Sequence, residues 1–225
     1  MAGGTGTEDQ RIVRLLAIET SGRTFSVALS ENGKLVSEIY LDEGRVHSEK
    51  LVPSIKKLLA GARWRFNSLD KIAVSTGPGS FTGIRVGLTC ARLLAQALKR
   101  PVVGINTLEL LESAVPEGDY TAVAAIDAGR GEVFVNACDP RIEEAKTYFA
   151  ELKRSNSKIL VAGDAAATHS DVIKSGLKKM LVKTPERLKF PRAGVLAVLA
   201  SQIKGLHYEK VKPLYIRRSW AEENK

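Results

Sequence analysis

The sequence is poor in cysteine and in long apolar runs. Cys90 and Cys138 are its two cysteines, and both stand in apolar surroundings without the spacing of a metal or redox pair. We expect both to be buried packing residues. No apolar run approaches the roughly 20 residues that cross a bilayer, and the start, MAGGTGTEDQRIVR, lacks the apolar stretch of a signal peptide. These absences exclude a secreted or membrane-spanning protein and predict a cytoplasmic one.

The composition is that of a folded globular protein. Hydrophobic residues make up 44% of the 225 residues and charged residues 26%, which argues against disorder and against a fibrous repeat. The length allows one large domain or two small lobes. A net charge of +9 is compatible with a nucleic-acid or acidic-protein partner, and equally with a generally basic surface.

The first half of the chain reads as a mixed sheet with helices against it. Short β-rich runs with turn residues between them predict two consecutive hairpins, and apolar spacing predicts a helix after them. A compact strand then enters the glycine turn TGPGSFTG, a long helix and another strand, which makes a βαβ unit with a parallel pair. In order, the predicted elements are 14–20, 24–30 and 34–41 as strands, 48–60 as a helix, 71–75 as a strand, a helix ending near 99 and 101–105 as a strand.

The second half begins in the same way as the first. A strand that ends in an acidic residue and small polar residues, followed by a hairpin, occurs at Glu19-Thr20-Ser21-Gly22 and again at Asp127-Ala128-Gly129-Arg130-Gly131. This repetition predicts a duplicated lobe. Its elements are a helix at 108–114, strands at 121–127, 133–138 and 159–162, and helices at 166–174 and 193–204, before a basic, aromatic tail, VKPLYIRRSW.

The segment GPGSFTGIR, 77–85, is the most distinctive in the chain. Its glycines permit backbone geometries closed to other residues, and Ser80 or Thr82 can cap the helix that follows. The N–H groups at such a turn can hold a phosphate or a carboxylate, but the turn can equally be a plain connector. No GKS or GKT follows, so it is not a P-loop.

Small residues recur every fourth position along the helix that starts at this turn. Gly83, Gly87, Ala91 and Ala95 form one ridge. The ridge can pack on the protein's own sheet, but we assign Ile84, Leu88, Leu94 and Leu98 to an apolar face elsewhere on the helix. We therefore expect the ridge to receive a helix of a partner protein.

Two acidic strand ends and one histidine are candidates for chemistry. Glu19 and Asp127 end equivalent strands, where they could face one another across a cleft and hold a metal–phosphate group, or simply form turns. His47 stands at the start of a predicted helix, where a lone histidine caps or packs more often than it catalyses.

Several of these segments together resemble the bacterial TsaB (YeaZ) family. They are LLAIETS, HSEKLVP, SLDKIAVSTGPGSFTGIRVGLTCARLLAQAL, PVVGINTLELL, AAIDAGRGEVF, VAGD and KPLYIRR, in order over nearly the whole chain. The resemblance implies an α/β fold of the actin and sugar-kinase type, with two lobes that each carry a ribonuclease-H-like mixed sheet. It also implies a role in making threonylcarbamoyladenosine in tRNA, with a TsaD-like catalytic subunit and a TsaE-like ATPase as partners.

The resemblance further implies that this chain is not the catalyst. TsaD-like proteins bind a catalytic metal through the histidines of a segment like NHLEGH, and here Thr107 and Leu111 stand in those places. Leucine has no donor atom, and a threonine hydroxyl is a poor substitute for imidazole. We expect no cofactor in the isolated chain, and ATP and metal only in the complex.

The sequence thus assigns a boundary to each part of the chain and a role to two sets of residues. Residues 1–11 are a disordered leader, native or a cloning remnant, 12–105 the first lobe, 106–205 the second, and 206–225 a tail returning to the first. The expected partner interface comprises His47, Leu51, Ile55, Gly83, Arg85, Gly87, Ala91 and Ala95. The candidate phosphate or nucleotide site comprises Glu19, Thr20, Ser21, Gly77, Gly79, Ser80, Asp127 and Gly163.

Other functions stay open at this level. A nucleotide-dependent phosphotransferase would use Glu19 and Asp127, although Glu19 is longer than the usual aspartate and Gly163 is a lone glycine. The isolated chain should form a homodimer through the interface it offers its partner. tRNA is expected to bind mainly through the complex, with the tail residues Lys210, Lys212, Arg217 and Arg218 adding phosphate contacts.

Overall fold

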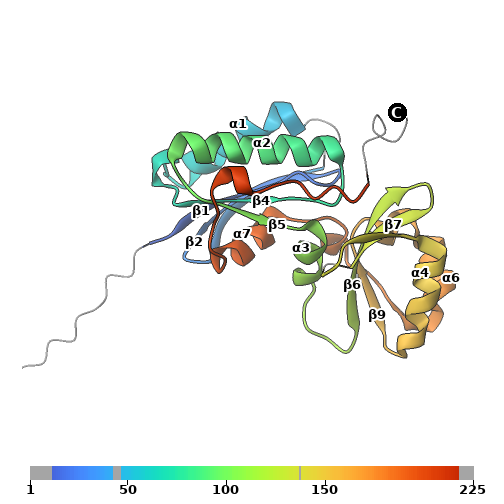
Figure 1. Ribbon diagram of the computed structural model, residues 1–225. Coiled ribbons are helices and arrows are strands. Elements are labelled where there is room, and N and C mark those ends of the chain that lie inside the picture. The colour runs from blue at the N-terminus through green and yellow to red at the C-terminus, as the bar shows by residue number, and fades with distance from the viewer. Residues whose placement is uncertain (1–11, 43–46, 137, 218–225) are drawn as a thin grey trace, which may run out of the picture.

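The computed structural model has two lobes, each built on a five-stranded mixed sheet (Figure 1). It describes residues 12–42, 47–136 and 138–217, and of His47 and Ser48 only the backbone. The predicted leader 1–11 and the tail residue Arg218 therefore lie outside the described residues. Among the helices of the described ranges, none has the length and apolar character needed to span a bilayer.

The sheet of the first lobe has the order β3-β2-β1-β4-β5. Two antiparallel hairpins form β1 to β3, and β4 and β5 add to β1 in parallel. Asn32 and Gly33 both have positive φ, as the two-residue turn of a tight hairpin requires. The strands are β1 Arg14–Glu19, β2 Phe25–Glu31, β3 Lys34–Leu41, β4 Lys71–Ser75 and β5 Val102–Ile105.

Helices cover both faces of this first sheet. α1 His47–Gly61 and α2 Phe81–Leu98 lie on one face, and α7 Ala193–Ser201 lies on the other (Figure 1). Alternate residues of β1 point to the two faces of the sheet. Leu16 and Ile18 pack in the core under α1 and α2, and Leu15 and Ala17 pack in the core with α7. The expected lobe boundary at 205 is therefore wrong for α7, because its apolar residues are buried by the first sheet.

The second sheet repeats the topology of the first. Its order, β10-β9-β6-β7-β8, has the same pattern of a three-strand antiparallel meander joined by two parallel strands. The predicted duplication is confirmed. The strands are β6 Thr121–Gly129, β7 Glu132–Val135, β8 Arg141–Glu144, β9 Ile159–Ala162 and β10 Leu181–Val182.

Short helices complete the second lobe. α3 connects the lobes, and its cap Asn106 accepts a hydrogen bond from the N–H of Glu109 at 2.8 Å. The prediction missed β8, α4 and β10, and the run expected as one helix at 166–174 is broken at His169. The helices are α3 Thr107–Ser113, α4 Ala145–Leu152, α5 Ala165–Thr168 and α6 Ser170–Leu177, with 3₁₀ turns η1 Phe66–Ser68, η2 Lys153–Ser155, η3 Lys178–Met180, η4 Glu186–Leu188 and η5 Tyr208–Lys210.

The tail from 206 to 217 runs along the first lobe and then reaches the second. Leu206 forms a β-bridge with Val102, and Val211 is buried in the core under α2. Farther on, Ile216 packs in a core of the second lobe. The tail thus holds the two lobes together through contacts with each.

The two cysteines differ in their environment. Cys90 is half-buried, and burial raises the pKa of its thiol to about 11, so it is an inert packing residue. Cys138 is exposed, which corrects the expectation that both are buried.

Candidate functional site

The glycine turn packs directly against the end of β1. Gly79 has a φ of +147°, and a Cβ there would lie 2.3 Å from the carbonyl oxygen of Ser21. The N–H of Ser80 donates to that same oxygen at 2.7 Å. On the other side, the carbonyl oxygen of Leu214 in the tail would lie 2.9 Å from a Cβ at Gly77. The turn is therefore enclosed between β1 and the tail.

Several of its polar groups are bonded within the chain. Ser80 caps α2 by accepting from the N–H of Gly83, and the carbonyl oxygen of Gly77 accepts from the N–H of Thr107. Gly77 and Gly79 are packed and the Ser80 N–H is donated to Ser21, so these parts of the turn are not available to a phosphate. Of the two alternatives, anion site or connector, the geometry favours the connector.

The small-residue ridge of α2 faces the protein's own sheet, so its assignment to a partner interface is wrong. A Cβ at Gly83 would lie 2.0 Å from the Thr20 carbonyl oxygen, and one at Gly87 would lie 2.2 Å from Thr20 Oγ1. Ala91 and Ala95 are buried in the same core. The ridge is small because α2 lies in contact with the backbone of β1.

Helix geometry explains this error. At 3.6 residues per turn, Gly83, Gly87, Ala91 and Ala95 span an arc of about 120°, and Ile84, Leu88, Leu94 and Leu98 fall within or next to that arc. The small and the large apolar residues therefore share one buried face rather than two opposite faces.

Two expected interface residues of α1 are also buried in the core. Leu51 and Ile55 are each 1% exposed and pack under the sheet-facing side of the helix. For His47 the structure describes no side chain. Arg85 is exposed, but its guanidinium lies 3.8 Å from the centre of the Phe81 ring and donates to the Tyr215 hydroxyl at 3.0 Å. Arg85 thus anchors the tail to α2.

The opposite sides of α1 and α2 carry exposed apolar residues. Leu93 is 60% exposed, the highest value among the large hydrophobic residues of the described chain, and Val52 on the neighbouring helix is 47% exposed. Thr89 and Ala97 are exposed on the same side of α2 as Leu93. We call Val52, Thr89, Leu93 and Ala97 the outer α1–α2 face. It is the surface that a partner could cover without displacing the core.

Glu19 is not available to a metal–phosphate group in this structure. Its side chain is fully buried, and Oε1 accepts from both the N–H and the hydroxyl of Ser21 at 2.6 Å. Burial raises the pKa of this carboxyl, against the opposing effect of its hydrogen bonds. Its second oxygen, Oε2, has no hydrogen-bond partner among the described residues. The carboxyl group of Glu19 thus lies inside the lobe, away from the surface. Thr20 and Ser21 are buried beside it.

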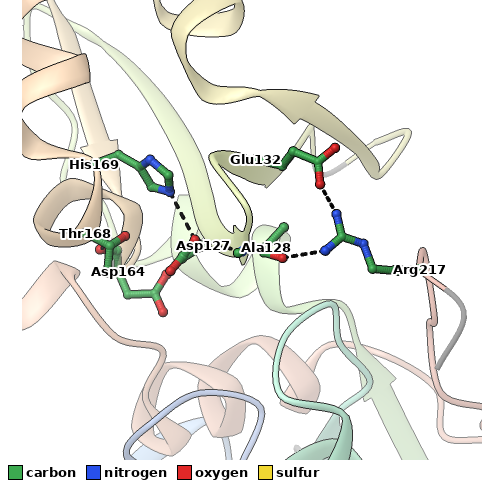
Figure 2. Close-up of polar contacts among 8 residues, drawn as sticks. Asp127, Ala128, Glu132, Asp164, Thr168, His169 and Arg217 are labelled. Atoms are coloured by element: carbon green, nitrogen blue, oxygen red, sulfur yellow. Dashed lines mark hydrogen bonds and ion pairs between the residues drawn. The ribbon is translucent and has the colours of Figure 1, made fainter. Parts of the chain in front are cut away.

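The equivalent strand end of the second lobe holds a polar cluster (Figure 2). Asp127 Oδ1 accepts from the N–H of Gly129 at 2.9 Å and lies 3.0 Å from His169 Nε2. The backbone N–H of Asp127 donates to Asp164 Oδ1 at 2.8 Å. We call Asp127, Asp164 and His169 the acid–histidine cluster. Sequence reasoning noticed Asp127 and Gly163-Asp164 but missed His169, which only the α5–α6 junction brings to them.

Burial, together with the nearby charge of Asp127, raises the pKa of Asp164 to about 6, against the opposing effect of the hydrogen bond from the Asp127 N–H. Asp164 therefore changes its charge near neutral pH. Beside the cluster, Arg217 of the tail donates to the Ala128 carbonyl oxygen at 2.7 Å and pairs with Glu132 (Figure 2). The tail is thereby bonded to the second lobe.

These residues do not fit the nucleotide and metal that the resemblance to sugar kinases implies. Glu19 is buried, the glycine turn is packed, and Asp127 already has two partners. Gly163 is buried as well, because a Cβ there would lie 2.1 Å from the Ala125 carbonyl oxygen. Thr107 and Leu111 are buried in the core. Nowhere in the described ranges do three histidine, cysteine or acidic side chains lie together as a metal site would require.

Comparison with known proteins gives the family. Residues 42–225 match the family model described as TsaD, tRNA N6-adenosine threonylcarbamoyltransferase. A Bacillus subtilis protein named tRNA threonylcarbamoyladenosine biosynthesis protein TsaB is 28% identical over 92% of this chain and 96% of its own. Its Escherichia coli counterpart is 33% identical over 54% of this chain and 53% of its own.

Solved structures agree with the sequence comparison. YeaZ from Pseudomonas aeruginosa superposes with a TM-score of 0.70 at 26% identity, over 90% of this chain and 99% of that one. Component A of (R)-2-hydroxyglutaryl-CoA dehydratase from Acidaminococcus fermentans, at 12% identity and a TM-score of 0.50 over 84% of this chain and 98% of that one, shares the fold alone. The α/β architecture is that of actin and the sugar kinases. The chain belongs to the TsaD family and, within it, to the TsaB (YeaZ) group.

Proposed function

We propose that this chain is a non-catalytic subunit of the machinery that makes threonylcarbamoyladenosine in tRNA, where it pairs with and activates a TsaD-like catalytic subunit. The relatives named as TsaB biosynthesis proteins support the pathway. The burial of Glu19, Thr107 and Leu111 supports an accessory rather than a catalytic role, because no acid or metal ligand is presented at those positions.

The observation that carries the pairing is the outer α1–α2 face. A helix layer normally exposes polar side chains to water, yet Leu93 and Val52 stand largely uncovered on neighbouring helices. Covering them with another apolar surface is favourable by about 25 cal/mol per Å² of apolar area removed from water. A TsaD-like protein belongs to the same family as this chain, so a similar helix pair on it would be a matching apolar surface, which supports it as the partner.

The test is a charge placed at the centre of this face. Leu93→Glu should weaken binding of the purified TsaD-like subunit from the same organism at least about tenfold, as expected for an apolar residue at an interface centre. The matched control is Val198→Glu on α7, because Val198 is an exposed aliphatic residue, 44% exposed, on the opposite face of the same sheet. Calorimetry measures both affinities.

Equal binding by Leu93→Glu and the unaltered chain, with both folded, would refute the interface. The substitution of a bulky residue for Gly87 is unsuitable for this purpose. Its side chain would collide with Thr20 inside the lobe and lower affinity by unfolding the chain.

The phosphotransferase alternative has less support. It requires Glu19 and Asp127 to face one nucleotide, whereas Glu19 is buried and Asp127 is bonded to His169 and Gly129. Calorimetry with Mg-ATP decides between the two functions. Binding that is lost in both Glu19→Ala and Asp127→Ala would favour the phosphotransferase.

A further inference from the structure

A cavity of about 400 Å³ lies in the second lobe, apart from the glycine turn and the acid–histidine cluster. It opens between the helices α5 and α6 on one side and β10 with the following segment on the other. Its size falls within the range of about 300–1,000 Å³ of small-molecule sites. Asp127, Asp164 and Gly163 are absent from its described lining, so it is a separate place on the lobe.

The walls of the cavity combine an apolar floor with a cationic rim. Ala166, Ile173, Leu181 and Val182 supply aliphatic surface, and Lys174, Lys183 and Lys189 supply ammonium groups. Glu186 is the acidic residue of the described lining, and it pairs with Lys189. We call these three lysines the lysine rim. An apolar floor suits a flat ring, and the rim suits an anion held beside that ring.

Two of the rim lysines have no ion-pair partner among the described residues. Lys189 pairs with Glu186, but Lys174 and Lys183 are exposed and form no ion pair with any acidic side chain of the described ranges. The segment 174–189 contains six basic residues and one acidic residue, which amounts to more than half of the net charge of +9. Such a concentration of like charge attracts a polyanion.

We infer that this surface binds RNA, with backbone phosphates on the lysine rim and one unstacked base on the apolar floor. Proteins that recognise RNA commonly take single-stranded bases out of the stack and hold them in pockets. An acidic peptide would satisfy the lysines but would leave the aliphatic floor uncovered. The choice of RNA rests on the proposed function, since a tRNA-modifying assembly has RNA as its substrate.

The place of the cavity fits an assembly that holds a protein and an RNA together. α6 lies at the far side of the second lobe from α1 and α2 (Figure 1). RNA bound at α6 and β10 would therefore leave the outer α1–α2 face open to the partner subunit.

The test measures binding of the full chain to a fluorescein-labelled tRNA transcript by anisotropy, at salt concentrations from about 50 to 200 mM. Lys174→Glu/Lys183→Glu should weaken binding about tenfold or more. It should also make the dependence of log K on log salt shallower, by about 0.7 to 0.9 for each phosphate that the variant no longer neutralises. The control is Lys210→Glu/Lys212→Glu, which makes the same change in net charge at exposed tail lysines and should change binding much less.

A second variant tests the base pocket without changing charge. Ala167 lines the cavity and is exposed, so Ala167→Trp fills the cavity from its rim without disturbing the core. It should weaken tRNA binding about fivefold or more, the lower end of what one base contact contributes, and leave the salt dependence unchanged.

Three results would overturn the inference. The first is that the lysine-rim double variant and the tail double variant weaken tRNA binding equally. The second is that the chain binds no tRNA at about 50 mM salt. The third is that AMP displaces tRNA at concentrations near the dissociation constant of tRNA itself. The last result would assign the cavity to a free nucleotide. The rim pair and Ala167→Trp should bind the TsaD-like subunit normally, so failure here is distinguishable from failure of the proposed pairing.

Discussion

The contact between α2 and β1 can be tested at Gly87, where the two interpretations of the small-residue ridge predict opposite results. A Cβ at Gly87 would lie 2.2 Å from Thr20 Oγ1, an atom that donates a hydrogen bond to the Gly83 carbonyl oxygen at 2.7 Å. Gly87→Ala must therefore move the Thr20 side chain. The next nearest atoms, Thr20 Cβ at 3.4 Å and Ile18 Cγ2 at 3.6 Å, are at ordinary contact distance.

The free energy of unfolding should fall by about 3 kcal/mol in Gly87→Ala. Overpacking costs about 1–3 kcal/mol, and displacing a buried hydroxyl from its acceptor costs about 1–3 kcal/mol. Alanine regains about 1 kcal/mol through its higher helix propensity. In a Thr20→Ala background the collision is gone, so the same substitution should be neutral or stabilising by up to about 1 kcal/mol. The coupling energy between the two positions should then be about 3–4 kcal/mol.

Urea denaturation measures this double-mutant cycle. Trp64 packs against the core of the first lobe and reports its unfolding, and Trp220→Phe removes the other tryptophan of the chain. If Gly87→Ala stabilises the unaltered chain and instead weakens binding of the TsaD-like subunit, the ridge contacts the partner and the packing argument is refuted.

Three further predictions follow from other contacts. Because the pKa of Asp164 is raised in the folded state, its contribution to the free energy of unfolding, about 2–3 kcal/mol, is complete below pH about 4 and is lost as the pH rises through about 6. The urea midpoints of the unaltered chain at pH about 4 and about 6 should therefore differ, and this difference should be smaller in Asp164→Asn. Tyr215→Ala removes the ring contact with Phe81 and the hydrogen bond from Arg85. The backbone N–H of Leu214, which donates to the Thr76 carbonyl oxygen, should then exchange with solvent about fivefold faster, the factor that corresponds to about 1 kcal/mol. The isolated chain should be a dimer by light scattering, and Leu93→Glu should make it a monomer.

Local patterns were sufficient to predict most of the fold. Turn residues at Asn32-Gly33 between β-rich runs predicted the hairpins of the first lobe, and the order strand, glycine turn, helix and strand predicted the parallel pair. The repeated acidic strand end predicted the duplication. β8 was missed because its sequence, RIEE, is mostly charged, and β10 because two residues carry no period.

The functional surfaces were harder to predict because they depend on which side of an element meets another. On α2 the helical wheel already places the small and the large apolar residues on one arc, and the contact of Gly87 with Thr20 shows that this arc is buried. Leu93 carried a signal that was overlooked, since it lies opposite the arc of Gly83 and Ile84 on the helical wheel. His169 reaches Asp127 across 42 positions of sequence, at a break between two helices that the periodicity does not mark.

The two duplicated lobes share a glycine contact with the backbone of the first strand but differ in the surroundings of the acidic residue beside it. In each lobe a glycine lies against a backbone carbonyl oxygen on or just after the first strand: Gly83, within α2, against Thr20 after β1, and Gly163, directly after β9, against Ala125 within β6. The acidic groups beside these contacts differ, because Glu19 is sealed inside its lobe while Asp127 is half-exposed and bonded to His169. The glycines therefore serve backbone packing in both lobes, whereas the two acids at the equivalent strand ends lie in different environments. The different environments of Glu19 and Asp127 are therefore consistent with the proposal that this chain acts through the outer α1–α2 face and the lysine rim.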